Sequence, residues 1–135
     1  MTILGLDVGE KRIGVALAEG LLAIPLTVID RRVEETDMEL IMALVEEYKA
    51  ERIVVGLPRL MNGNIGTQAE EILSFSGALA GHVDIPVDTW DERLSTVTAE
   101  RLLIDTGMKR KKRKGKIDSM AAAIILQAYL DGTNK

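Results

Sequence analysis

Hydrophobic residues follow two different periods along this chain, and the change from one to the other predicts the order of its strands and helices. The first third contains three apolar runs separated by turn residues, which predict strands at 3–8, 12–18 and 22–29. The first two runs are close enough in sequence to form an antiparallel hairpin. Pro25 lies inside the third run and cannot donate a backbone hydrogen bond, so we expect that strand at an edge of the sheet.

The remaining two-thirds alternate between helical and extended patterns. Apolar residues recur at helical spacing from Ile41 to Tyr48 and predict a helix over about 36–50. The same criteria predict the other elements, which are a strand at 52–57, a helix at about 69–80, a strand at 85–90, a helix from about 96 to 105 and a helix at 118–130. This order predicts one α/β domain over 1–135, with a mixed sheet and helices on both faces.

Composition narrows the classes of function. The chain has no cysteine, which excludes disulfides, thiolate nucleophiles and zinc ribbons. Aromatic residues make up only 3% of the chain, which argues against base stacking as the main device for binding nucleic acid. No apolar run approaches the roughly 20 residues of a membrane span, and the chain begins in a strand-like pattern rather than in a signal peptide. We therefore expect a cytoplasmic protein without a membrane partner.

Charge is distributed very unevenly. The formal net charge is −4, yet seven of the eight residues at 109–116 are basic, so the rest of the chain carries −11. One concentrated positive segment in an acidic chain is typical of a surface that binds a phosphate backbone. We interpret the segment as a loop; the alternative is a solvated loop that binds nothing in particular. Its basic residues are Lys109, Arg110, Lys111, Lys112, Arg113, Lys114 and Lys116.

Three carboxylates occur where strands end or a helix begins. Asp7 lies within the first apolar strand, Glu92 follows the fifth strand, and Asp118 opens the last predicted helix. The carboxyl edge of a sheet is where open α/β folds usually bind ligands. Carboxylates without histidine or cysteine form an oxygen site suited to Mg²⁺ or Mn²⁺. Two such ions about 4 Å apart activate water and stabilise the leaving oxygen in phosphodiester cleavage.

Each carboxylate also has an ordinary structural interpretation. Asp7 can be a buried aspartate that accepts backbone hydrogen bonds, and Asp118 suits the N-cap of a helix. The run Asp91-Glu92-Arg93 can be a solvated turn with a local ion pair. The residues by themselves leave these alternatives open.

Four segments of the chain resemble, in order and spacing, the bacterial YqgF/RuvX family, whose members are described as pre-16S rRNA nucleases and Holliday-junction-resolvase-like proteins. The resemblance covers residues 3 to about 130. The segments are Gly5-Leu6-Asp7-Val8-Gly9-Glu10-Lys11-Arg12-Ile13-Gly14-Val15-Ala16, Gly56-Leu57-Pro58, Asp91-Glu92-Arg93-Leu94-Ser95-Thr96 and Asp118-Ser119-Met120-Ala121-Ala122-Ala123-Ile124-Ile125-Leu126-Gln127.

The resemblance implies a ribonuclease-H-like fold with strand order 3-2-1-4-5 and antiparallel pairing of the first three strands. It also implies that Asp7, Glu92 and Asp118 are the catalytic residues and hold Mg²⁺ or Mn²⁺. The implied activity is metal-dependent endonucleolytic processing of the 5′ end of pre-16S ribosomal RNA. The alternative is resolution of branched DNA, which requires two symmetric cuts and hence a homodimer, whereas the RNA activity does not exclude a monomer.

Three further arginines are expected to contact nucleic acid. Arg12 and Arg93 are close in sequence to the proposed metal ligands and suit stabilisation of transition-state charge, whereas Arg59 suits backbone binding. Some related resolvases carry further carboxylates, but the fourth strand here ends in Gly56-Leu57-Pro58, and Ala121 stands one turn after Asp118. This reduced set keeps open a third hypothesis, a non-catalytic RNA-binding module of the same fold.

Overall fold

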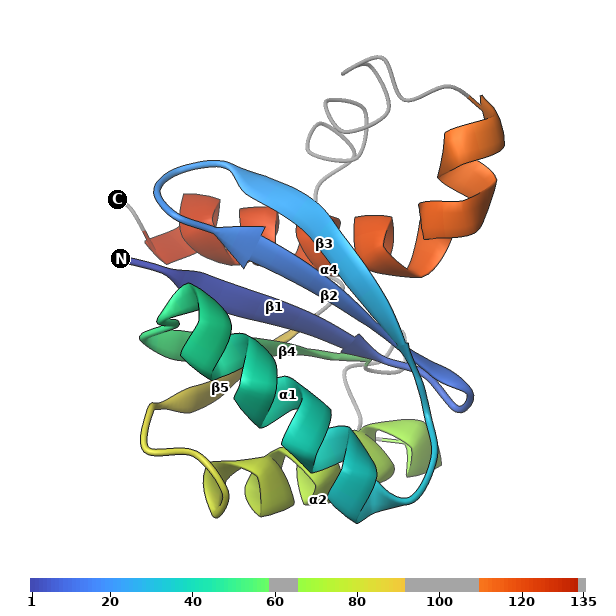
Figure 1. The fold of residues 1–135 in the computed structure, drawn as a ribbon, viewed down its shortest axis with the longest axis vertical. Coiled ribbons are helices and arrows are strands. Elements are labelled where there is room, and N and C mark those ends of the chain that lie inside the picture. The colour runs from blue at the N-terminus through green and yellow to red at the C-terminus, as the bar shows by residue number, and fades with distance from the viewer. Residues whose placement is uncertain (59–65, 92–109, 134–135) are drawn as a thin grey trace.

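The computed structural model describes residues 1–58, 66–91 and 110–133, with side chains described from residue 119 onward in the last range. Its centre is a five-stranded mixed sheet whose strands lie in the order β3-β2-β1-β4-β5 (Figure 1). β1 pairs antiparallel with β2, β2 pairs antiparallel with β3, and β4 pairs parallel with both β1 and β5. The strands are β1 (Ile3–Val8), β2 (Arg12–Ala18), β3 (Ala23–Asp30), β4 (Arg52–Leu57) and β5 (Val87–Asp91).

The edge position of β3 confirms the expectation from Pro25. Ala16 is opposite Pro25, whereas Val15 is opposite Thr27, so the β2–β3 register shifts by one residue at this point. An edge strand tolerates such an irregularity because its outer backbone groups do not pair within the sheet.

Two helices cover one face of the sheet. These are α1 (Glu34–Tyr48) and α2 (Thr67–Ala80), which lie below the sheet in the view of Figure 1. Alternate residues of the central strands, among them Leu4, Leu6 and Val55, form a buried core with this pair of helices. Ile41 in α1 is fully buried, as its helical spacing predicted, and Tyr48 is half-buried. Burial raises the pKa of the Tyr48 phenol, and the adjacent Glu47 adds to this effect.

The other face is covered by α4 (Arg110–Thr133), which packs across β1, β2 and β3. A second core cluster forms here, with Ile3 and Val54 from the sheet against Ala122 and Leu126 from the helix. Helices on both faces and the strand order 3-2-1-4-5 confirm the fold expected from the sequence. Among the described residues, no helix is long and apolar enough to cross a membrane.

Two expectations about the last helix were wrong. The basic segment was expected to be a loop, but α4 begins at Arg110, so residues 110–116 form its first turns. Asp118 is consequently inside the helix and is not its N-cap. The physical reason is that lysine and arginine are good helix formers, and one glycine, Gly115, costs only about 1 kcal/mol inside a helix. Figure 1 shows these first turns (orange) extending beyond the sheet.

Candidate active site

The carboxyl ends of β1, β4 and β5 lie at one edge of the sheet because these three neighbouring strands are parallel. Asp7 is the penultimate residue of β1, and Asp91 is the last residue of β5. Leu57 ends β4 between them and is opposite Asp91. These strand ends therefore lie at one edge, but of the three proposed ligands only the Asp7 side chain is among the described residues. Glu92, which follows Asp91 directly, lies outside them.

Asp7 faces α4. Side chains alternate along a strand, so Asp7 shares a face with Ile3 and Gly5, and Ile3 belongs to the core cluster beneath α4. The carboxylate is half-buried and has interaction partners in the structure. Asp7 therefore lies near the carboxyl edge of the sheet, where the sequence led us to expect it.

The strand neighbours of Asp7 carry no side chains. Asp7 is opposite Gly14 in β2. On the other side Leu6 is opposite Val55, and the continuation of this register brings Gly56 beside Asp7. No cross-strand side chain from these two positions competes with the carboxylate for the space above the sheet.

The helix α4 approaches β1 very closely at Gly5. A Cβ atom on Gly5 would lie 2.8 Å from the Leu126 Cβ and 3.3 Å from the Ala122 carbonyl oxygen. These distances leave no room for a larger residue in the strand. Gly5 is therefore the point that sets the separation between the helix and the sheet.

The direction of α4 follows from its contacts. The Gln127 side chain accepts a hydrogen bond from the Ala23 amide in β3. Ala23 pairs with Ala18 of β2, and Ala18 pairs with Ile3, so this contact lies at the amino end of β1. Since Ala122 lies against Gly5, the helix runs antiparallel to β1, as Figure 1 also shows. Residues that precede Ala122 in α4 therefore lie toward the end of β1 that carries Asp7. Asp118, whose side chain is outside the described set, is one helical turn before Ala122.

The far end of α4 is anchored to the sheet by polar and aromatic contacts that the sequence did not reveal. The Gln127 side chain accepts a hydrogen bond from the Ala23 amide (2.9 Å) and donates one to the Leu21 carbonyl (3.0 Å). Trp90 of β5 packs edge-to-face on Tyr129, with ring centroids 5.5 Å apart. The only sequence signal for these roles was the position of Gln127 within the last family-like segment.

An ion pair joins the amino ends of β4 and β5. Arg52 donates a hydrogen bond to Asp88, and this bond is the main reason that the pKa of Arg52 is raised above its usual value. Tyr129 contributes to the same effect. The pair lies at the opposite end of the strands from Asp7, so it supports the sheet without approaching the candidate site.

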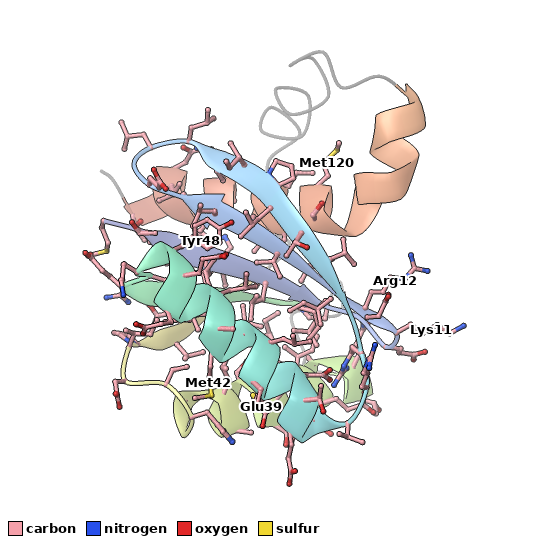
Figure 2. All side chains as sticks on the ribbon, in the orientation of Figure 1. Lys11, Arg12, Glu39, Met42, Tyr48 and Met120 are labelled. Atoms are coloured by element: carbon pink, nitrogen blue, oxygen red, sulfur yellow. The ribbon has the colours of Figure 1, made fainter. Side chains whose placement is uncertain are left out.

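The structure places some of the predicted nucleic-acid-binding residues and leaves others undescribed. Arg12 is exposed at the turn between β1 and β2, where Figure 2 shows it beside Lys11. Arg59, Arg93 and Lys109 lie outside the described residues. The backbone of Arg110, Lys111, Lys112, Arg113, Lys114 and Lys116 belongs to α4, but their side chains are not described. Among the described side chains no cluster of three metal-binding residues occurs, and two of the three proposed ligands are not in that set.

Comparison with known proteins identifies the family. The sequence matches the RuvX family, described as "Holliday junction resolvase", over residues 1–132. The chain belongs to the RuvX family. A RuvX relative from Desulforamulus reducens, named "Putative pre-16S rRNA nuclease", is 51% identical over 137 residues that cover 100% of both chains. A protein of the same name from Halothermothrix orenii is 50% identical and covers 100% of this chain and 98% of its own length.

Solved structures of low sequence identity share the fold. T. thermophilus RuvC in complex with a Holliday junction substrate superposes with a TM-score of 0.67 at 18% identity, covering 98% of this chain and 97% of that chain. The Fowlpox virus resolvase in complex with Holliday junction DNA gives a TM-score of 0.60 at 10% identity, covering 100% of both chains. The resemblance seen in the sequence, the ribonuclease-H-like fold and the expectation of a nuclease are confirmed, and the substrate class is nucleic acid.

Proposed function

We propose that this RuvX-family protein is a metal-dependent endonuclease that cleaves structured RNA at the 5′ end of the pre-16S ribosomal precursor. The observation that carries the proposal is the arrangement around Asp7. This carboxylate faces α4 at the carboxyl edge of the sheet, β5 ends two strands away immediately before Glu92, and α4 runs antiparallel to β1 with Asp118 one turn before Ala122. The names of the close relatives support RNA as the substrate.

The donor set fits a divalent cation. Asp7, Glu92 and Asp118 supply carboxylate oxygens only, which suits Mg²⁺ or Mn²⁺. The paired position beside Asp7 in β2 is Gly14, so no side chain from that position would compete with an ion for the carboxylate. When bound, the cation would activate the attacking water and stabilise the leaving oxygen.

The chain's own residues supply binding and orientation. The strand β1 holds the Asp7 carboxylate at the sheet edge, and the close contact at Gly5 fixes the distance of α4 from it. We propose that the basic first turns of α4 bind the phosphates that flank the cleaved bond, with Arg59 as a further contact. Arg12, exposed on the neighbouring turn, and Arg93 would stabilise the negative charge that develops on the phosphate.

The test is a cleavage assay with Mg²⁺ and with Mn²⁺ on a pre-16S 5′-leader RNA. We expect cleavage in the presence of metal and a loss of about 100-fold or more in Asp7→Asn, because the amide is a poor metal ligand, with RNA affinity retained. Asp84→Asn is the matched control, since Asp84 is an exposed aspartate between α2 and β5. Equal cleavage by Asp7→Asn and wild type would refute the metal assignment.

A second candidate activity is resolution of four-way DNA junctions. The description of the RuvX family and the junction complexes of RuvC and the viral resolvase favour it. A four-way junction offered in the same assay distinguishes the two activities. Paired symmetric cuts in the junction, with the RNA left intact, would replace the RNA assignment by the DNA assignment.

A further inference from the structure

Arg31 joins three elements behind the candidate site. It follows the last residue of β3, and its Nη1 atom donates a hydrogen bond to the Gly9 carbonyl (2.9 Å). Its guanidinium also lies over the Phe75 ring of α2, 5.4 Å from the centroid. The Arg31 backbone amide donates to the Lys11 carbonyl (2.8 Å). One residue therefore binds the turn between β1 and β2 through both its backbone and its side chain.

A buried carboxylate holds the Arg31 side chain in place. The Asp37 side chain, in the first turn of α1, is fully buried. One of its oxygens is 3.5 Å from the Arg31 Nε atom, and the other accepts a hydrogen bond from the Arg32 amide (3.0 Å). A buried carboxylate is costly without such partners, and a planar guanidinium presents several donors in a fixed geometry. Asp37 thus fixes the direction from which Arg31 reaches Gly9.

The turn that Arg31 binds connects two residues of the candidate site. The Gly9 amide donates to the Arg12 carbonyl (2.8 Å), and a Cβ on Gly9 would lie only 2.9 Å from that oxygen. Asp7 precedes this tight turn by two residues, and Arg12 is part of it. A displacement of the turn would therefore move both side chains relative to α4.

Arg31 acts from the side of the sheet opposite to α4. Phe75 belongs to the core between the sheet and α1 and α2, whereas Asp7 faces α4. Arg31, Gly9 and Glu10 line a cavity of about 300 Å³ on the α1–α2 side. A shorter side chain at position 31 would leave the Gly9 carbonyl facing this cavity, where a mobile water could replace the guanidinium donor without holding the turn.

We propose that Arg31, oriented by Asp37, is a positioning residue that holds the β1–β2 turn and thereby places Asp7 and Arg12 for phosphodiester cleavage. This inference rests on the nuclease activity proposed above. Arg31 itself contacts neither substrate nor metal in this role. Its effect should consequently appear in the rate of the bond-breaking step and leave RNA affinity unchanged.

The experiment compares Arg31→Lys with Arg52→Lys. Lysine keeps the charge beside Asp37 but carries all its donors on one nitrogen, so it cannot bind Gly9 and Asp37 in the geometry of the guanidinium. Arg52→Lys is matched because Arg52 also pairs with an aspartate, Asp88, at the far end of the sheet. For each protein we would measure single-turnover cleavage of the leader RNA at saturating enzyme, RNA affinity, Tm and amide hydrogen exchange at Gly9.

We expect Arg31→Lys to cleave 10- to 100-fold more slowly at unchanged RNA affinity, because small displacements of catalytic groups have effects of that size. Exchange at the Gly9 amide should be faster in this variant and unchanged in Arg52→Lys, although both variants lower Tm. Arg31→Met, which removes every donor, should lower the rate further. Asp37→Asn should resemble Arg31→Lys.

Two results would overturn the inference. A normal cleavage rate in both Arg31 variants despite a lower Tm would reduce Arg31 to a contributor to stability. Unchanged exchange at Gly9 would show that Arg31 does not hold the turn. Absence of RNA cleavage by the wild-type protein would instead refute the proposed function, and the exchange rate at Gly9 would still decide whether Arg31 holds the turn.

Discussion

Two residues of β1, Gly5 and Asp7, lie on the same face of the sheet and have different roles. Gly5 allows the backbone of α4 to approach, and Asp7 lies two residues later, at the carboxyl edge of the sheet. The role of Gly5 requires the absence of a side chain. The proposed role of Asp7 requires a carboxylate at the sheet edge, beside Gly14 of the neighbouring strand. Both roles depend on which face α4 covers.

Gly5→Ala is expected to destabilise the protein by about 1–3 kcal/mol, because the new methyl group would lie 2.8 Å from the Leu126 Cβ and force the helix away from β1. The free energy of unfolding in urea measures this effect. Gly77→Ala is the control, since a Cβ on Gly77 in α2 would meet no atom within 4 Å. That variant should gain up to about 1 kcal/mol from helix propensity, and an equal loss in both variants would contradict the packing argument.

At the scale of elements, α4 combines two functions along its length. Its first turns carry the basic residues beyond the edge of the sheet, and its second half is anchored over β1, β2 and β3. Positive charge at a helix N-terminus is unfavourable because it lies at the positive end of the helix dipole. The packing of the second half must therefore offset this cost, and the Gln127 contacts are part of that packing.

Gln127→Leu is expected to lower the free energy of unfolding by about 1–3 kcal/mol, since it leaves the part-buried Ala23 amide without its acceptor and removes the bond to Leu21. Chemical denaturation monitored by circular dichroism checks the value. Gln68→Leu serves as a control because Gln68 is exposed in the first turn of α2. A loss in the control as large as that in Gln127→Leu would exclude a specific role for these hydrogen bonds.

At the scale of the whole molecule, the uneven charge decides how a protein of net charge −4 binds a polyanion. The chain outside 109–116 carries −11 and repels nucleic acid at long range. We therefore expect the strongest long-range attraction at the start of α4, which projects beyond the sheet (Figure 1). This attraction would orient a bound nucleic acid relative to the sheet edge that carries Asp7.

Replacing Lys111, Lys112 and Arg113 with glutamine is expected to reduce the salt dependence of RNA binding. Each phosphate contact contributes about 0.7 to the slope of log affinity against log salt for single strands, so three lost contacts should lower the slope by about 2. Fluorescence anisotropy at several salt concentrations measures it. Lys49→Gln, at the exposed end of α1, should leave the slope unchanged. An unchanged slope in the triple variant would place the nucleic-acid contact elsewhere.

Local patterns were sufficient for most elements of the fold. The periods of the apolar residues placed all five strands within two residues of their observed ends, and Pro25 correctly indicated the edge strand. These features are encoded locally, because the side-chain period and the backbone donor of each residue do not depend on distant parts of the chain. The start of α4 was missed because the dense run of basic residues was interpreted as a loop, whereas helix propensity prevailed.

The sequence also indicated a candidate site, since a carboxylate within an apolar strand requires an explanation wherever it occurs. Asp7 lies at the carboxyl edge of the sheet, while the catalytic roles of Asp7, Glu92 and Asp118 remain predictions. Only the tertiary structure revealed that Gly5 allows the close approach of α4 to β1 and that Gln127 anchors this helix to β3. It alone also showed that Arg31 joins Gly9 to the buried Asp37. Each of these contacts depends on the pairing register and on helix placement, which bring together residues that no local period relates.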